Sequence, residues 1–158
     1  MVDFFSRHTI AHHEFGLTNE VFQLVCQSFF LPEFDLFASS EMHVVEKWAS
    51  YCWTNDAKAG DAFLMKTWPQ RSYIFPPIPL LNEVVSRLVD QQDLEFILLA
   101  PISSHNPPMW YPLLMDLVSE EPLILGRISE VCHLQTGKAP ETPGYLAAFA
   151  RCKSSKRC

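Results

Sequence analysis

Apolar residues follow one another along the chain in two patterns, one typical of buried strands and one typical of amphipathic helices. Short and nearly unbroken apolar runs predict strands that are covered on both faces. Residues at helical spacing predict helices, with a threonine, paired serines or a proline where three of them begin. The strands are expected at 34–38, 72–75, 94–100 and 123–128, and the helices from Thr18, from Ser39, from Pro79, at 110–118 and, shorter, at 145–149.

Strands and helices alternate in this prediction, which favours an α/β class. The expected architecture is a Rossmann-like single domain, with a mainly parallel sheet and helices on both faces. In such sheets ligands bind at the carboxyl ends of strands, so chemistry is expected in the loops after Ala38, Phe75 and Ala100. Pro101 is expected to end its strand. The expected organisation is a linker at 1–15, the domain at 16–134 and a flexible basic tail at 135–158.

The charge distribution narrows the class of partner. The 158 residues include 18 acidic and 12 basic ones, a net charge of −6, and residues 151–158 hold four bases and no acid. The remaining body is strongly acidic and repels phosphate, so DNA is expected to be at most a weak partner.

The five cysteines are odd in number and have no metal-binding spacing, which favours an intracellular protein with reduced thiols. No apolar stretch reaches the roughly 20 residues that a membrane helix needs.

Several segments, in order, carry a resemblance to a known family. They read FDLFASSEMH (34–43), GDAFLMKTW (60–68), SYIFPPIPLL (72–81) and FILLAP (96–101). The arrangement resembles phage-type Dam adenine-specific DNA methyltransferases, and more closely the Dam-like region of DIRS-type retrotransposon polyproteins, whose sequences are similar at FGLTNEVFQLVCQSF (15–29) as well. The opening VDFFSR (2–7) resembles the end of the RNase H domain that precedes this region. The resemblance covers residues 2–128.

The resemblance implies that Phe75, Pro76, Pro77 and Ile78 occupy the catalytic motif. In the family, a polar residue before the two prolines accepts hydrogen bonds from the target amino group, and an aromatic residue after them stacks on the flipped base. Phe75 offers no acceptor and Ile78 no flat ring. Such losses cost about 2.7–4 kcal/mol for the polar contact and about 1–3 kcal/mol for stacking. We therefore expect no catalytic residues and no enzyme activity.

The resemblance also places S-adenosylmethionine near Asp35, Ser39 and Asp61. These residues have the oxygens to bind a ribose or an amino group, but no glycine-rich turn accompanies them. The alternative is that Asp35 and Asp61 cap helices or accept from loop amides. We expect no cofactor and no metal, with S-adenosylmethionine as the alternative cofactor.

Two other segments contain residue patterns that occur in functional motifs. Asn106-Pro107-Pro108 has the Asn-Pro-Pro sequence of the methyltransferase motif. However, it follows the preceding strand after a gap, and a methionine stands where the motif has an aromatic residue. We therefore expect these residues to form a loop that leads into a helix. His8, His12 and His13, with Glu14, have a spacing that could bring metal ligands together on a helix, but Glu14 adjoins His13 in sequence, so a fourth ligand is missing.

The expected function is that of a retroelement-derived, catalytically degenerate methyltransferase-like domain with a structural or protein-interaction role. Its expected partners are another protein or the neighbouring domains of a polyprotein, and not a membrane. Two alternatives stay open. One is an active S-adenosylmethionine-dependent DNA adenine methyltransferase, and the other is a domesticated protein-binding module.

Overall fold

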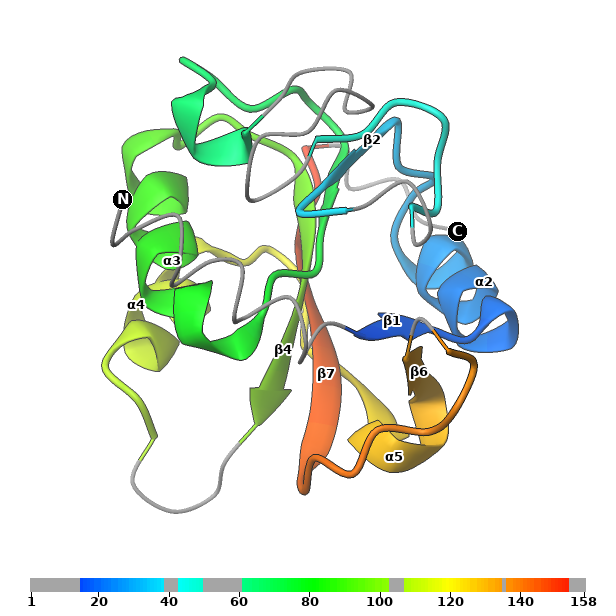
Figure 1. The fold of residues 1–158 in the computed structure, drawn as a ribbon. Coiled ribbons are helices and arrows are strands. Elements are labelled where there is room, and N and C mark those ends of the chain that lie inside the picture. Colours follow the sequence, from blue (N-terminus) through cyan, green and yellow to red (C-terminus); the bar gives the residue numbers. More distant parts are fainter. Residues whose placement is uncertain (1–14, 39–42, 50–60, 103–106, 135, 154–158) are drawn as a thin grey trace, which may run out of the picture.

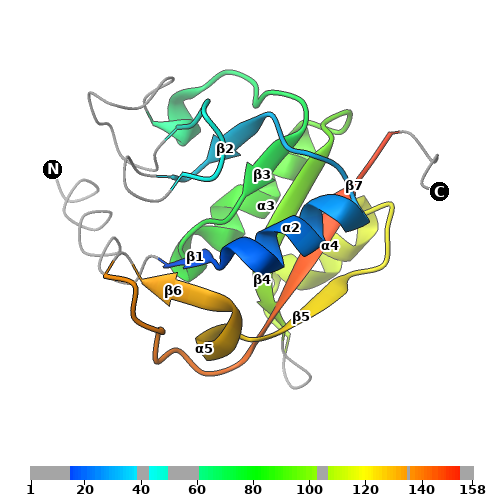
Figure 2. The ribbon, with the colours of Figure 1, turned by 90° about the vertical axis from the view of Figure 1, so that its right-hand side faces the viewer.

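The computed structural model describes residues 15–38, 43–49, 61–102, 107–134 and 136–153. Within them a five-stranded sheet forms the centre of the molecule (Figure 1), and Figure 2 shows its strands in the order β2-β3-β4-β7-β5. Its strands are β2 (Phe34–Leu36), β3 (Ser72–Ile74), β4 (Phe96–Ile102), β5 (Leu123–Arg127) and β7 (Tyr145–Arg151).

The sheet is mixed rather than mainly parallel. β2, β3 and β4 pair in parallel, whereas β7 pairs antiparallel with β4 and with β5. The two antiparallel ladders are longer than the two parallel ones. Because β7 opposes both of its neighbours, β5 runs in the same direction as β2, β3 and β4, and β7 alone is reversed. The α/β class is confirmed, and the parallel pairing is confined to the β2-β3-β4 half of the sheet.

Helices cover both faces of this sheet (Figures 1 and 2). On one face lie α3 (Leu81–Asp90) and α4 (Trp110–Leu117), with the short 3-10 turns η2 (Ala62–Leu64) and η3 (Ile78–Leu80). On the other face lie α2 (Asn19–Ser28) and α5 (Ile128–Val131), together with a small antiparallel pair made by β1 (Phe15–Leu17) and β6 (Cys132–Leu134). Each face therefore has its own hydrophobic cluster.

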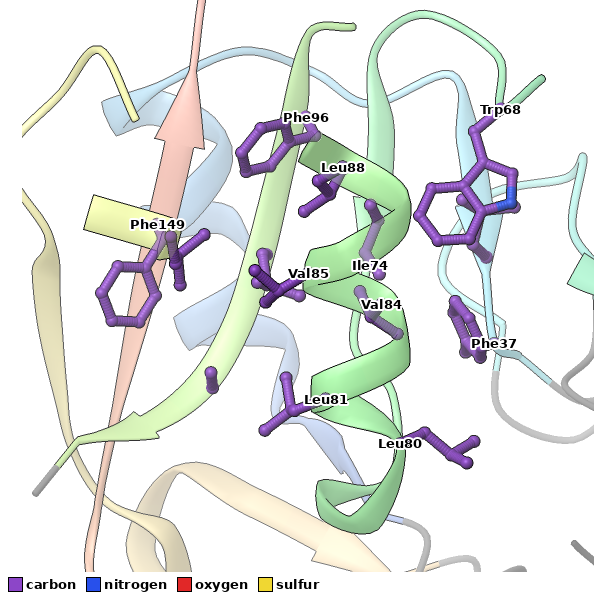
Figure 3. Packing of buried hydrophobic residues seen from close by; sticks show 14 of the residues in the cluster. Phe37, Trp68, Ile74, Leu80, Leu81, Val84, Val85, Leu88, Phe96 and Phe149 are labelled. Carbon is purple, nitrogen blue, oxygen red and sulfur yellow. The ribbon is translucent and has the colours of Figure 1, made fainter. Parts of the chain in front are cut away.

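β4, at the centre of the sheet, contributes side chains to both clusters, as do its neighbours β3 and β7. Phe96 and Leu98 pack toward α3, while Ile97 and Leu99 pack toward α2, and all four side chains are buried. Figure 3 shows the face of α3 that carries the residues predicted at helical spacing, Leu81, Val84, Val85 and Leu88, turned toward the sheet. The amphipathic pattern of this segment thus predicted both its helix and its buried face.

Most predicted elements are present, with differences at their ends. The helix predicted from Thr18 is α2, whose N-cap is Thr18, and those predicted from Pro79 and at 110–118 are α3 and α4. Pro101 does not end β4, which continues to Ile102 with Pro101 opposite Leu146 of β7. β3 ends opposite Leu98, so β4 has no strand on that side beyond this point, and proline is tolerated at such an edge.

The helix predicted to begin at Ser39 is not formed by residues 43–49, and residues 39–42 lie outside the described part. Instead, Lys47 and Ala49 bond to the outer edge of β2. The Asp35 amide donates to the Lys47 carbonyl at 2.9 Å, and the Ala49 amide donates to the Asp35 carbonyl at 2.9 Å. This outer segment therefore caps the β2 edge of the sheet.

The prediction of a separate tail after Leu134 is wrong for residues 145–151. The short helix expected at 145–149 is instead part of β7, which lies between β4 and β5. Alanine-rich sequence favours a helix locally, but burial of Leu146–Ala150 on both faces of the sheet overrides that preference. Arg151, counted among the basic residues of the tail, donates to the carbonyl oxygens of Leu94 and Gln91.

No helix in the described segments is long and apolar enough to span a membrane.

Removing residues 145–158 is expected to abolish cooperative unfolding, because β4 and β5 then lose the strand that joins them. The point variant Phe149→Ala, which keeps β7, is expected to lower the free energy of unfolding by about 3–5 kcal/mol. Urea denaturation followed by circular dichroism measures both. A truncated chain that unfolds cooperatively near the parent midpoint would contradict the central position of β7.

Candidate functional site

The carboxyl end of β2 is closed by an aromatic side chain. Phe37 follows β2 with a φ of 62°, a left-handed conformation that is rare for a bulky residue. Such a backbone costs about 1–3 kcal/mol, and the ring is buried in compensation. It meets Phe63 and Trp68 edge to face, with ring centroids 5.0 and 5.8 Å apart. The position after the strand, where a glycine would leave room for a ligand, is therefore filled (Figure 3).

The segment after β3 is closed in a similar way on the opposite face. Phe75 is 9% exposed and belongs to the cluster beneath α2, and Pro76 and Pro77 are also buried. Ile78 is 38% exposed and begins η3. The residue at the acceptor position of the family motif thus packs into the core, and the residue at the stacking position is a partly exposed aliphatic.

The carboxylates of Asp35 and Asp61 both accept from backbone amides. Asp35 Oδ2 lies 2.7 Å from the Val44 amide nitrogen, and Asp61 Oδ1 lies 2.9 Å from that of Phe63. Asp61 is the N-cap of η2, and Asp35 holds the segment beside β2 in place. These are the capping and loop-amide roles that the sequence left as the alternative to cofactor binding. Ser39 lies outside the described residues.

A cavity of about 690 Å³ lies between α2, β1 and the segment at 43–44. Leu17, Phe22 and Val44 form apolar walls of the cavity. The rest of its lining includes side-chain amides, imidazoles and a thiol, from Asn19, Gln23, Cys26, Gln27, His43 and His133. The His43 ring stacks on Trp48 at a centroid distance of 5.3 Å. Neither Asp35, Asp61 nor residues 75–78 line this cavity, so the structure does not gather the predicted site residues there.

Tyr73 lies in β3 beneath α2, and sequence reasoning did not single it out. Its ring meets the Phe22 ring at 5.2 Å, edge to face, and its hydroxyl is buried with no hydrogen-bond partner among the described groups. Burial raises the pKa of Tyr73, and the nearby Asp35, Cys132 and Cys26 raise it further. Within an apolar strand, nothing in the sequence distinguishes such a hydroxyl from an ordinary core tyrosine.

The thiols near the cavity are poor nucleophiles. Burial raises the pKa of Cys26 and raises that of Cys132 to about 12, so both stay protonated at neutral pH. In the described part of the chain, no group of three or more histidine, cysteine or carboxylate side chains is placed to hold a metal. The amide and imidazole side chains that line the cavity can exchange hydrogen bonds with a polar ligand.

Neither the Asn-Pro-Pro segment nor the histidine set forms a second site within the described residues. Asn106 and the set of His8, His12, His13 and Glu14 lie outside the described residues. Pro107 and Pro108 are exposed just before α4, where the Tyr111 amide donates to the Pro108 carbonyl. The two prolines thus stand in a loop that opens a helix, as the sequence predicted.

Comparison with known proteins adds no relative: no family model matches the chain, and no curated protein sequence matches it either.

Replacing Phe75 by asparagine places a polar acceptor at the position to which the resemblance assigns one, and we expect it to destabilise the fold. The amide would enter an apolar cluster and leave a cavity, which costs about 3 kcal/mol or more. Ile78→Asn, the same change at a partly exposed site, is expected to cost about 1 kcal/mol or less. Urea denaturation compares the two, and a Phe75→Asn chain as stable as the parent would show that position 75 is open to water.

Tyr73→Phe is expected to leave the free energy of unfolding unchanged or to raise it by about 1 kcal/mol, because it removes a buried hydroxyl that has no hydrogen-bond partner among the described residues. Thermal and urea unfolding measure this change. A loss of more than about 1 kcal/mol would show instead that the hydroxyl is hydrogen-bonded, for example through a buried water.

Proposed function

We propose that this chain is a methyltransferase-like domain that has lost catalysis and cofactor binding and acts as a structural or protein-interaction domain. The common direction of β2, β3, β4 and β5, with helices on both faces, supports a Rossmann-like origin. The strand ends that carry the resemblance, after β2 and after β3, lie in the parallel half of the sheet. In such folds this is the edge where ligands bind.

The burial of Phe75 is the observation that carries the proposal. Adenine methylation in this family needs an oxygen acceptor against the target amino group, and the corresponding side chain here is a phenyl ring packed in the core. Ile78 provides no stacking surface for a flipped base. Loss of the acceptor costs about 2.7–4 kcal/mol, and loss of the stacking contact costs about 1–3 kcal/mol. Together these losses lower the rate of methyl transfer by several orders of magnitude.

The surroundings of β2 support loss of the cofactor as well. Phe37 fills the turn after the strand, and the segment at 43–49 runs beside β2 where a helix was predicted. A cofactor at this edge commonly uses the amides of a glycine-rich turn and of the helix that follows it. Here the corresponding carboxylates, Asp35 and Asp61, already accept from the protein's own amides.

A non-catalytic role fits the resemblance to a retroelement polyprotein. Such a domain connects or recruits other proteins, and an origin in a retroelement makes the neighbouring polyprotein domains its first candidate partners. The acidic body disfavours DNA as a partner. The rival function, an active adenine methyltransferase, would require the Phe75 segment to rearrange and expose a backbone acceptor.

The test is to titrate the full chain with S-adenosylmethionine and to assay methyl transfer to adenine-containing duplex DNA. We expect no saturable heat up to about 1 mM ligand and no label on adenine above the level without protein. An active adenine methyltransferase measured in parallel controls for the quality of the cofactor and the DNA. Micromolar binding together with labelled adenine would overturn the proposal.

A further inference from the structure

The two edges of the central sheet differ. The β2 edge is capped by residues 47–49, which bond to its backbone. β5, at the other edge, pairs with β7 along one side, and no described strand pairs with its other side (Figure 2). An open edge presents backbone donors and acceptors that can pair with another strand.

The sequence of β5 favours pairing with another strand, because its edge residues are apolar and not charged. Residues 123–125 are Leu-Ile-Leu, and the Ile124 side chain is 62% exposed. Leu123 and Leu125 turn inward and pack on the cluster beneath α2. Pro122 and the β-bulge between Ile124 and Gly126 limit regular pairing to a short stretch, which restricts the register rather than blocking the edge.

The charges at the two ends of β5 are complementary to each other. Glu121 precedes the strand and Arg127 ends it, and both side chains are exposed. When two copies of β5 lie antiparallel, the acidic start of one meets the basic end of the other at both ends. A parallel arrangement would place like charges together, so the charge pattern selects the antiparallel, two-fold symmetric one.

A groove next to the acidic end provides a place for the basic end of another molecule. It has a volume of about 560 Å³ and lies between the end of α2, at Ser28 and Phe29, and residues 119–123. At the other end of β5, the Arg127 guanidinium lies over the Tyr145 ring at 5.8 Å, and Tyr145 is itself 45% exposed. Arginine and tyrosine are the residue types that most often anchor protein interfaces.

We propose that the partner at the β5 edge is a second copy of this chain, paired antiparallel through residues 123–125 with Ile124 near the two-fold axis. Arg127 of each copy then reaches the groove beside Glu121 of the other copy, while Tyr145, one strand inward, lies under the Arg127 guanidinium of its own copy. The five strands of each copy join into one continuous sheet. A pairing of three residues is too small for a stable dimer, which needs about 1,200 Å² of buried surface, so the two groove contacts supply the rest.

This assignment rests on the interaction role proposed above and gives that role a partner. The two proposals fail separately. A monomeric chain overturns only the dimer, whereas methyl transfer to adenine overturns the non-catalytic role whatever the oligomeric state.

The test is sedimentation equilibrium of the full chain from about 1 to 200 µM. The parent is expected to associate reversibly to a dimer. Ile124→Lys places a charge on the pairing edge and is expected to leave a monomer across the range. Leu64→Lys, which makes the same change at a 78% exposed residue of η2, is expected to dimerise like the parent. Thermal unfolding verifies that both variants fold.

A charge exchange tests the arrangement of the two strands. Arg127→Glu and Glu121→Arg are each expected to weaken the dimer by about tenfold, and the double variant is expected to return it to within about threefold of the parent. A parent that is monomeric throughout overturns the proposal, even if it captures a different protein. An Ile124→Lys chain that still dimerises, or a double variant that does not recover, overturns it as well.

Discussion

The burial of β4 on both faces is the constraint on which the rest of the structure depends. Its side chains alternate between the cluster under α3 and the cluster under α2, so both layers pack against this strand. β3 on one side and β7 on the other fix its direction and register. Because β7 returns the chain between β4 and β5, a segment that is remote in sequence completes the sheet. Any functional edge of the molecule is positioned relative to this strand.

The carboxyl edge of the parallel strands is where such a sheet would hold a ligand, and here aromatic rings occupy it from both faces. Phe37 closes the end of β2 toward α3, at the cost of a left-handed backbone, and Phe75 closes the end of β3 toward α2. The polar atoms nearby, the carboxylates of Asp35 and Asp61, serve the backbone. Buried aromatic side chains therefore occupy the positions at which such a sheet would contact a ligand.

Sequence patterns predicted the parts of this fold that local physics determines. The helical spacing of Val84, Val85 and Leu88 and the unbroken apolar run of β4 predicted those elements correctly. The pattern failed at residues 145–149, where alanine's helix preference is overridden by burial between two strands, and at residues 43–49, where edge pairing with β2 replaces a helix. At the site, the capping role of Asp61 was among the predicted alternatives. The orphan hydroxyl of Tyr73 and the polar cavity were not predicted, because tertiary contacts alone create them.

Phe37 and Phe75 fill the edge after β2 and β3, and we propose that this edge does not bind S-adenosylmethionine. The most direct measurement follows the ring resonances of Phe37 and Phe75 and the methyl resonances of Ile78 by NMR during a titration with that cofactor. The account predicts that these signals stay in place up to about 1 mM ligand. Saturable shifts at Phe75 and Ile78 would show a nucleoside lodged against them and would contradict the account.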